Sequence, residues 1–197
     1  FTADGGTIKL DGNYPVGTGN VALGNTALTS VTTASSLTAV GDDALNAVTS
    51  GSASVAVGRA ALTANTTGAF NTAIGRSALA NNTTASNNTA VGYQALDANT
   101  TGTNNVAVGK SAGGSITTGS YNVLSGALTG DALTEGNSNV AIGDEALSAD
   151  TLGSTSIAIG RRTLKVQNFT SATSGYNIAI GHSAGTAVTT GTNNTLI

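Results

Sequence analysis

Small and hydrophobic residues return along this chain at a fixed interval. The segment NTAIGRSALANNTTASN (71–87) is followed by NTAVGYQALDANTTGTN (88–104), which nearly repeats it. The glycine that closes each N-x-A-x-G block recurs every 17 residues and once after 21, at Gly24, Gly41, Gly58, Gly75, Gly92, Gly109, Gly126, Gly143, Gly160 and Gly181. A fixed period of this kind is the signature of repeat architectures, so the chain is read as one repeat array.

Alternate positions within each block differ in kind. The residues one and three before the anchor glycine are mostly Val, Ile or Thr, and the residue between them is Ala in nine blocks. This period-2 alternation, bounded by glycine, predicts a short strand. Because neighbouring strand residues face opposite sides, we expect the β-branched pair to face the interior and the alanine column to face outward.

A second element is expected after each anchor glycine. Two variable residues come first, and in most blocks Ala-Leu follows, which predicts a second short strand whose Leu points to the same interior. A Thr-Thr-Gly turn then commonly closes the repeat. Two strands and two turns per repeat predict an all-β fold, a parallel β-solenoid of about ten 17-residue coils. At the usual spacing of parallel strands, ten coils span roughly 48 Å.

A column of asparagines lies four residues before the anchor glycine. Stacked coils would let each amide bond the coils above and below it. We therefore assign a structural turn role to this column and to the anchor glycines, represented by Asn71, Gly75, Asn88, Gly92, Asn105 and Gly109.

The array is predicted to cover residues 20–197, with 1–19 as an N-terminal cap or connector. Thr7 to Leu10 is a strand candidate within this lead. Ile197 stands one residue before another glycine would be due, so we expect the array to be truncated at its C-terminal end.

Composition narrows the classes of function. Charged residues make up 9% of the chain and the net charge is −3, which does not favour a nucleic-acid binder with its basic surface. No apolar run approaches the roughly 20 residues that a membrane helix needs. There is no cysteine, so a disulfide or thiolate site is absent from this sequence, and no cofactor or metal is expected.

Oligomerisation is expected because each coil buries few hydrophobic side chains and because one face of the strands keeps a small residue. A strand face open to water would tolerate larger polar residues, whereas this face keeps Ala through nine repeats. We therefore expect identical chains to pack side by side through the alanine column, although another wall of the same coil could also face it.

The repeated N-[TV]-A-[IV]-G-x-x-A-L motif resembles the head repeats of YadA-like trimeric autotransporter adhesins. It is still more similar to the NTAVG-type repeats of bacteriophage tail fibres. The resemblance covers residues 20–197 and implies a left-handed parallel β-roll in a homotrimeric fibre. It also implies an extracellular location, on a virion tail fibre or a bacterial cell surface, and attachment to a host or surface receptor. Adjacent fibre domains are implied as further partners.

Candidate receptor contacts lie where the repeat varies. The two positions after the anchor glycine are variable, as expected of an outward ridge that binds or is merely solvated. The long repeat gathers Arg161, Arg162, Lys165 and Phe169, and Tyr93 lies on the same ridge. We predict a lateral knob that contacts an anionic glycan or a neighbouring fibre module. A loop that packs Phe169 onto its own coil is the alternative.

Other functions have less support in the sequence. The paired carboxylates at 42–43 and 144–145 lie six coils apart, roughly 29 Å, too far for a glycosidase pair. We expect no enzyme and no catalytic residues. The recurring Thr-Thr pairs leave an ice- or crystal-surface-binding solenoid as one alternative, with one outward Thr per coil. A passive shaft, with the receptor site in a flanking domain, is the other.

Overall fold

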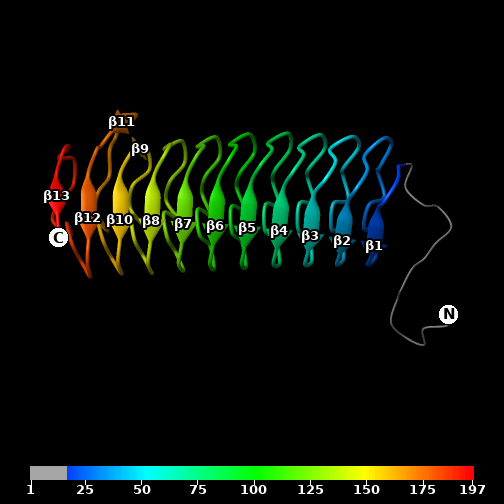
Figure 1. Cartoon of the computed structure of the whole chain (residues 1–197), viewed down its shortest axis with the longest axis horizontal. Helices are drawn as coiled ribbons and strands as arrows, with labels where there is room; N and C mark the ends of the chain where they lie inside the picture. The colour runs from blue at the N-terminus through cyan, green and yellow to red at the C-terminus, as the bar shows by residue number, and fades with distance from the viewer. Residues whose placement is uncertain (1–16) are drawn as a thin grey trace.

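The computed structural model describes residues 17–197 as a single all-β solenoid without helices (Figure 1). The coils stack along one axis, from β1 at the N-terminal end to β13 at the C-terminal end. Most of the expected N-terminal cap, including the strand candidate at 7–10, lies outside the described residues.

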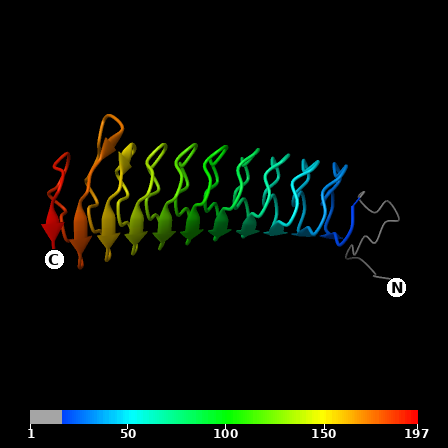
Figure 2. The same cartoon turned by 45° about the horizontal axis from the view of Figure 1, so that its top comes forward.

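Each coil contributes one strand to a continuous sheet. The strands of this 11-stranded sheet are β1 (Val21–Leu23), β2 (Thr38–Val40), β3 (Val55–Val57), β4 (Thr72–Ile74), β5 (Thr89–Val91), β6 (Val106–Val108), β7 (Val123–Ser125), β8 (Val140–Ile142), β10 (Ile157–Ile159), β12 (Ile178–Ile180) and β13 (Thr195–Leu196). All pairs are parallel, and the alanines pair with each other across the coils, as Ala73 does with Ala90. The predicted parallel solenoid of about ten coils is confirmed, and Figure 2 shows the strands aligned along one side.

The two faces of the sheet are the reverse of the prediction. The alanine column faces the interior, where Ala56, Ala73 and Ala90 have no exposed surface. The β-branched residues on either side of it face outward, as in β6, where Val106 and Val108 are both exposed. The coil is narrow, and its interior is already filled by side chains from the turns, so only a small residue fits at the middle of each strand.

The second strand predicted at Ala-Leu is absent from the described coils. Ala61 and Leu62 are consecutive and both fully buried, which a strand does not allow because neighbouring residues point to opposite faces. Successive tight turns bring both side chains inward, and Leu62 has a positive φ of 52°. This left-handed conformation is uncommon for a bulky residue, so the packing of the Leu side chain must offset its cost.

The anchor glycines are required by both conformation and space. Gly75 has a φ of 134°, a region in which L side chains are strained. A Cβ built there would lie 2.4 Å from the backbone oxygen of Gly92 in the next coil. Close stacking of backbone on backbone at this corner explains why glycine recurs at every anchor position.

Asparagine amides join the coils through the interior. In the column before each strand, the backbone N–H of Asn88 donates to Oδ1 of Asn71 at 3.0 Å, and Nδ2 of Asn88 donates to the carbonyl of Gly102 at 2.8 Å. These coil-to-coil bonds are those that the asparagine column predicts.

A second buried asparagine column, which was not predicted, is formed by Asn65, Asn82 and Asn99. Nδ2 of Asn82 donates to Oδ1 of Asn65 at 2.8 Å, and Nδ2 of Asn99 donates to Oδ1 of Asn82 at 2.9 Å.

The coil around β7 departs from the pattern without losing its register. Leu124 replaces the interior alanine of β7 and is fully buried, yet β7 pairs in register with both neighbours. The positions where other coils place the interior Leu hold Gly113 and Gly130 here, and a Cβ on either would lie within 3.0 Å of a Leu124 methyl group. Leu124 therefore fills the volume that the two glycines leave, and we find no bulge at this coil.

The long repeat adds its extra residues at one corner only. Asn168 still bonds at the ordinary spacing to the coil below, through Thr151, whereas Gly175 bonds Ser154 at the longer spacing. The insertion therefore lies between these two residues. It forms β11 (Thr173–Ser174), which pairs with β9 (Gly153–Ser154) in a separate two-stranded sheet that stands out in Figures 1 and 2.

Candidate functional site

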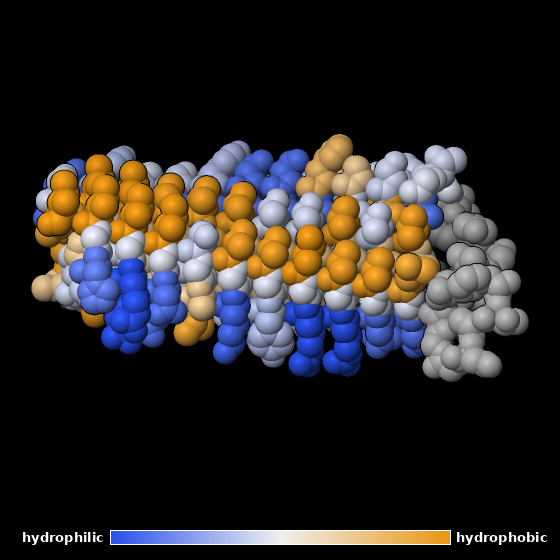
Figure 3. Space-filling view, turned by 60° about the horizontal axis from the view of Figure 1, so that its bottom comes forward, coloured by the Kyte–Doolittle hydropathy of each residue, from blue (hydrophilic) through white to orange (hydrophobic). Residues whose placement is uncertain are grey.

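The outward face of the long sheet carries a continuous apolar stripe. We call it the sheet face and define it by the two columns that flank the interior alanine. Several of its members keep between 38% and 47% of their surface exposed, namely Val21, Ile74, Val106, Val108, Val123, Ile142, Ile178 and Ile180. Figure 3 shows the stripe running the length of the solenoid, interrupted by a few polar residues. Contiguous apolar surface with a polar rim is typical of an interaction site.

Charged side chains line one edge of this face. They come from the first position after the anchor glycine, which is charged in six of the ten coils, and this position forms the mostly hydrophilic row below the stripe in Figure 3. This charged ridge includes Arg59 and Arg76. The Arg76 guanidinium lies 5.6 Å from the ring centroid of Tyr93, within the range of a cation–π contact. Tyr93, one of the candidate receptor contacts, is 41% exposed.

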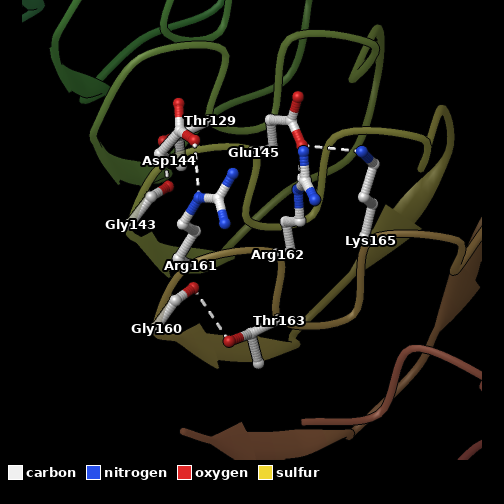
Figure 4. Close-up of polar contacts among 9 residues, drawn as sticks. All are labelled: Thr129, Gly143, Asp144, Glu145, Gly160, Arg161, Arg162, Thr163 and Lys165. Atoms are coloured by element: carbon white, nitrogen blue, oxygen red, sulfur yellow. Dashed lines mark hydrogen bonds and ion pairs between the residues drawn. The ribbon is translucent and has the colours of Figure 1, made fainter. Parts of the chain in front are cut away.

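The three candidate cations of the long repeat lie beside two carboxylates of the coil below (Figure 4). Arg161 Nε lies 3.3 Å from Asp144 Oδ2, one repeat before it, which makes an ion pair between stacked coils. Arg162 Nε and Lys165 Nζ lie 2.7 and 2.6 Å from the same Glu145 oxygen. Hydrogen bonds from Lys165 and then Arg162 lower the pKa of Glu145 to about 2. Three cations face two anions here, so the cluster has a small positive excess.

Phe169 does not take part in an exposed knob. It is only 4% exposed, and its ring lies against the backbone of Gly175, where an added Cβ would meet Cε2 at 3.1 Å. Phe169 packs onto its own coil, as the alternative prediction stated. Burial of this large apolar side chain fastens the inserted loop to the solenoid.

A buried polar network lies behind the loop and was not foreseen. Asp150 Oδ2 accepts a hydrogen bond from Gln167 Nε2 at 2.7 Å, and Gln167 Oε1 accepts one from Asn177 at 2.8 Å. The backbone N–H groups of Gly153 and Phe169 donate to the other Asp150 oxygen. These bonds satisfy the buried carboxylate and hold the corner from which the insertion leaves. The sequence contains a signal for this network, because Asp150 and Gln167 occupy an interior column that holds Val, Asn, Ile or Leu in the other coils.

Two further carboxyl groups have pKa values above the usual value for aspartate. Burial raises the pKa of Asp97 and, two coils further on, that of Asp131. Among residues 17–197 there is no group of three His, Cys, Asp or Glu side chains that could hold a metal ion. Asp97 accepts a hydrogen bond from Gln94, and Asp131 lies within electrostatic reach of Glu145 and Lys165.

The threonine pairs form one internal and one external column. The first Thr of each pair donates its hydroxyl to the backbone carbonyl of the next coil, as Thr66 does to Thr83 at 3.1 Å. The second, such as Thr67, is exposed. One outward Thr per coil is the arrangement that the alternation of neighbouring residues predicts.

No family model, curated protein or solved structure matches this chain. Within the described part of the chain, no helix is long and apolar enough to cross a membrane.

Proposed function

We propose that this chain is the structural and adhesive segment of a homotrimeric surface fibre, which attaches a virion or a bacterial cell to its host or to another surface. The observation that carries the proposal is the sheet face. A stripe of exposed Val and Ile that continues over about ten coils is costly to leave in water, and identical copies can cover it completely.

The length of the sheet face fits a cover made of copies of the chain. At the spacing of parallel strands it is about 48 Å long and about 10 Å wide, or about 480 Å² per chain. Three chains that turn this face to a common axis would bury about 1,400 Å² in total, or about 480 Å² at each of the three pairwise contacts, so the two edges of the face must add area to reach the size of a stable interface. The number three and the left-handed coil rest on the resemblance to YadA-like and tail-fibre repeats.

This proposal moves the chain-to-chain contact from the alanine column to the β-branched columns. The alanines are buried inside each coil and are not accessible to a partner. The exposed pairs, such as Ile178 and Ile180 of β12, take their place.

The surface that remains outside such a trimer would make the attachment. It carries the turn side, the inserted loop and the flank of the charged ridge. Arg162, Lys165 and Tyr93 remain candidate contacts, whereas Arg161, at the edge of the sheet face, is left to the contact between copies and the side chain of Phe169 is buried. Because Glu145 and Asp144 neutralise most of the local positive charge, we propose a polar or weakly anionic surface glycan as the ligand in an extracellular setting.

The assembly is tested by the mass of the chain in solution. We expect light scattering to give three times the chain mass, and Ile142→Lys to release folded monomers because it places a charge in the middle of the sheet face. Ser50→Lys, on an exposed turn, is the matched control and should leave the trimer intact. A wild-type chain that stays monomeric at high concentration would reject the proposal.

Attachment is tested separately on an intact trimer. The double change Arg162→Ala and Lys165→Ala should reduce binding to target cells without changing the mass of the assembly. Unchanged binding of this variant, together with wild-type binding that requires only flanking domains, would assign this segment the role of a passive shaft.

A further inference from the structure

Exposed aromatic residues occupy one column at the edge of the sheet face. Phe70, Tyr121 and Tyr176 each lie two residues before a strand and are 65%, 63% and 58% exposed. All three have positive φ, at 59°, 62° and 49°. This left-handed conformation disfavours bulky side chains, and most other members of the column are Ser, Ala, Asn or Gly. An aromatic residue at this position is disfavoured by the backbone conformation and by its exposure to water. This combination points to a contact outside the chain.

The aromatic residues recur at every third coil. Phe70 and Tyr121 are 51 residues apart, which is three repeats. Tyr121 and Tyr176 are 55 residues apart, which is three repeats plus the inserted four. The coils between them carry Asn87, Asn104 and other small or polar residues in the same column. Three coils correspond to about 14 Å along the fibre.

Cations recur with the same period on the opposite edge. Arg59, Lys110 and Arg161 of the charged ridge are each 51 residues from the next, and each lies one coil before one of the three aromatics. The remaining cation of the ridge, Arg76, already has an aromatic partner in Tyr93 of its own chain. Within residues 17–197, every Arg or Lys of the ridge is therefore matched to an exposed aromatic residue.

The matched groups lie on opposite edges of one chain. The three-residue strand between the two edges is about 10 Å long, which keeps the two columns apart. In a ring of parallel copies that turn their sheet faces inward, however, the leading edge of one copy meets the trailing edge of the next. Such a ring brings the aromatic column of each chain against the charged ridge of its neighbour.

We propose that Phe70, Tyr121 and Tyr176 of one copy pack on Arg59, Lys110 and Arg161 of the adjacent copy, as three cation–aromatic contacts that fix the stagger of the chains along the fibre. The sheet face alone is too uniform to set this stagger, because a shift by one coil mostly replaces one β-branched residue with another. The aromatic and cationic columns repeat only every third coil and so exclude one- and two-coil shifts. This inference rests on the proposed assembly of identical chains.

Disulfide capture tests the pairing directly, because the natural chain has no cysteine. The variant Lys110→Cys with Tyr121→Cys should form covalent dimers and trimers under mild oxidation, seen on a denaturing gel and reversed by a reductant. A disulfide requires Cα atoms within about 7 Å, so a bond inside one chain is excluded by the width of the strand. Each single-cysteine variant should remain monomeric on the gel.

The matched control is Lys110→Cys with Thr155→Cys. Thr155 occupies the same column two coils beyond Tyr121, about 10 Å along the axis, and should not crosslink. Trimers by mass that crosslink through Thr155, or through neither pair, would overturn the proposed stagger while leaving the fibre intact. A monomer by mass would overturn the fibre and the stagger together.

Loss of the aromatics supplies a second measurement. Changing Phe70, Tyr121 and Tyr176 to Ala together should make the trimer dissociate at a lower temperature or populate shifted assemblies. Changing Asn87, Asn104 and Thr155 of the same column to Ala should leave dissociation at its wild-type temperature. Equal behaviour of the two triple variants would contradict the contacts.

Discussion

The coils on either side of Gly109 fill their interiors with large and small side chains at opposite positions. Before it, each coil places Ala at the middle of its strand and Leu at the turn, as Ala90 and Leu96 do. After it, the coil of β7 reverses the sizes, with Leu124 in the strand between Gly113 and Gly130 of the turns. The backbone register is the same in both regions. The fold therefore conserves interior volume rather than the residue at each position.

At the same boundary one interior column changes from polar to apolar. The ladder of Asn65, Asn82 and Asn99 ends where Ile116 takes the next place, and Asn99 Oδ1 is left without a hydrogen-bond partner. Beyond it Leu133 continues the apolar column. Four variants test how these differences affect stability.

Leu124→Ala should have the largest effect. It removes the side chain that fills the space of two glycines, so a cavity remains that no neighbour can close. We expect the free energy of unfolding to fall by about 2–5 kcal/mol in urea titrations. Leu128→Ala, at a half-buried turn of the same coil, is the control and should cost clearly less. Equal losses would mean that Leu124 does not carry the interior of this coil.

Gly113→Leu should destabilise by about 3 kcal/mol, at the upper end of the cost of overpacking. Its Cβ alone would lie 2.8 Å from Leu124 Cδ1, although its φ of 58° is one that Leu adopts in other coils. Combined with Leu124→Ala, it restores the arrangement of the earlier coils. We expect the double variant to be more stable than Leu124→Ala alone in the same titration. Additive losses would contradict the exchange of volume between the two positions.

Asn82→Ala should cost about 2 kcal/mol, because it leaves Asn65 Oδ1 without its donor inside the coil. The neighbouring Asn81, which is exposed and bonds only the carbonyl of Asp97, gives the control Asn81→Ala. Thermal unfolding followed by circular dichroism would rank the two. A larger loss for Asn81→Ala would show that the buried ladder contributes little.

Glu145→Gln should have the smallest effect, confined to acid. The pKa of Glu145 is lowered from 4.5 to about 2, so the folded state holds this carboxylate charged where the unfolded chain would bind a proton. The stabilisation is present above pH 4.5 and is lost as the pH falls through 2. We expect Glu145→Gln to flatten the fall of the melting temperature between these values. The exposed Glu135→Gln is the control, and an unchanged slope for Glu145→Gln would contradict this assignment.

The period, the strands and their parallel register could be read from the sequence, because each depends on residues that recur at a fixed place. The facing of the strands could not be read from hydrophobicity alone. The larger Val and Ile suggested an interior, yet their columns also admit Thr72, Thr89 and Ser125, whereas the middle position admits only Ala and, in two coils, Leu. The interior position of each strand was better indicated by the small set of residues found there than by high hydrophobicity.

The candidate contacts were found only in part, for a related reason. Asp144 and Arg161 are one repeat apart, so stacking alone places them together. Phe169 lies at the insertion, where the repeat pattern no longer predicts which way a side chain faces. Its burial depends on the path of the inserted loop, which only the structure shows. The cationic and aromatic columns become visible once the edges of the sheet face are known.

The corner between Asn168 and Gly175 has a practical consequence. Extra residues leave and return there while the sheet beneath keeps its pairing, since Ile157 and Ile178 remain partners across the longer repeat. Foreign peptides grafted at the equivalent corner of other repeats should thus be displayed at chosen intervals along the rod, with the rod itself unaltered.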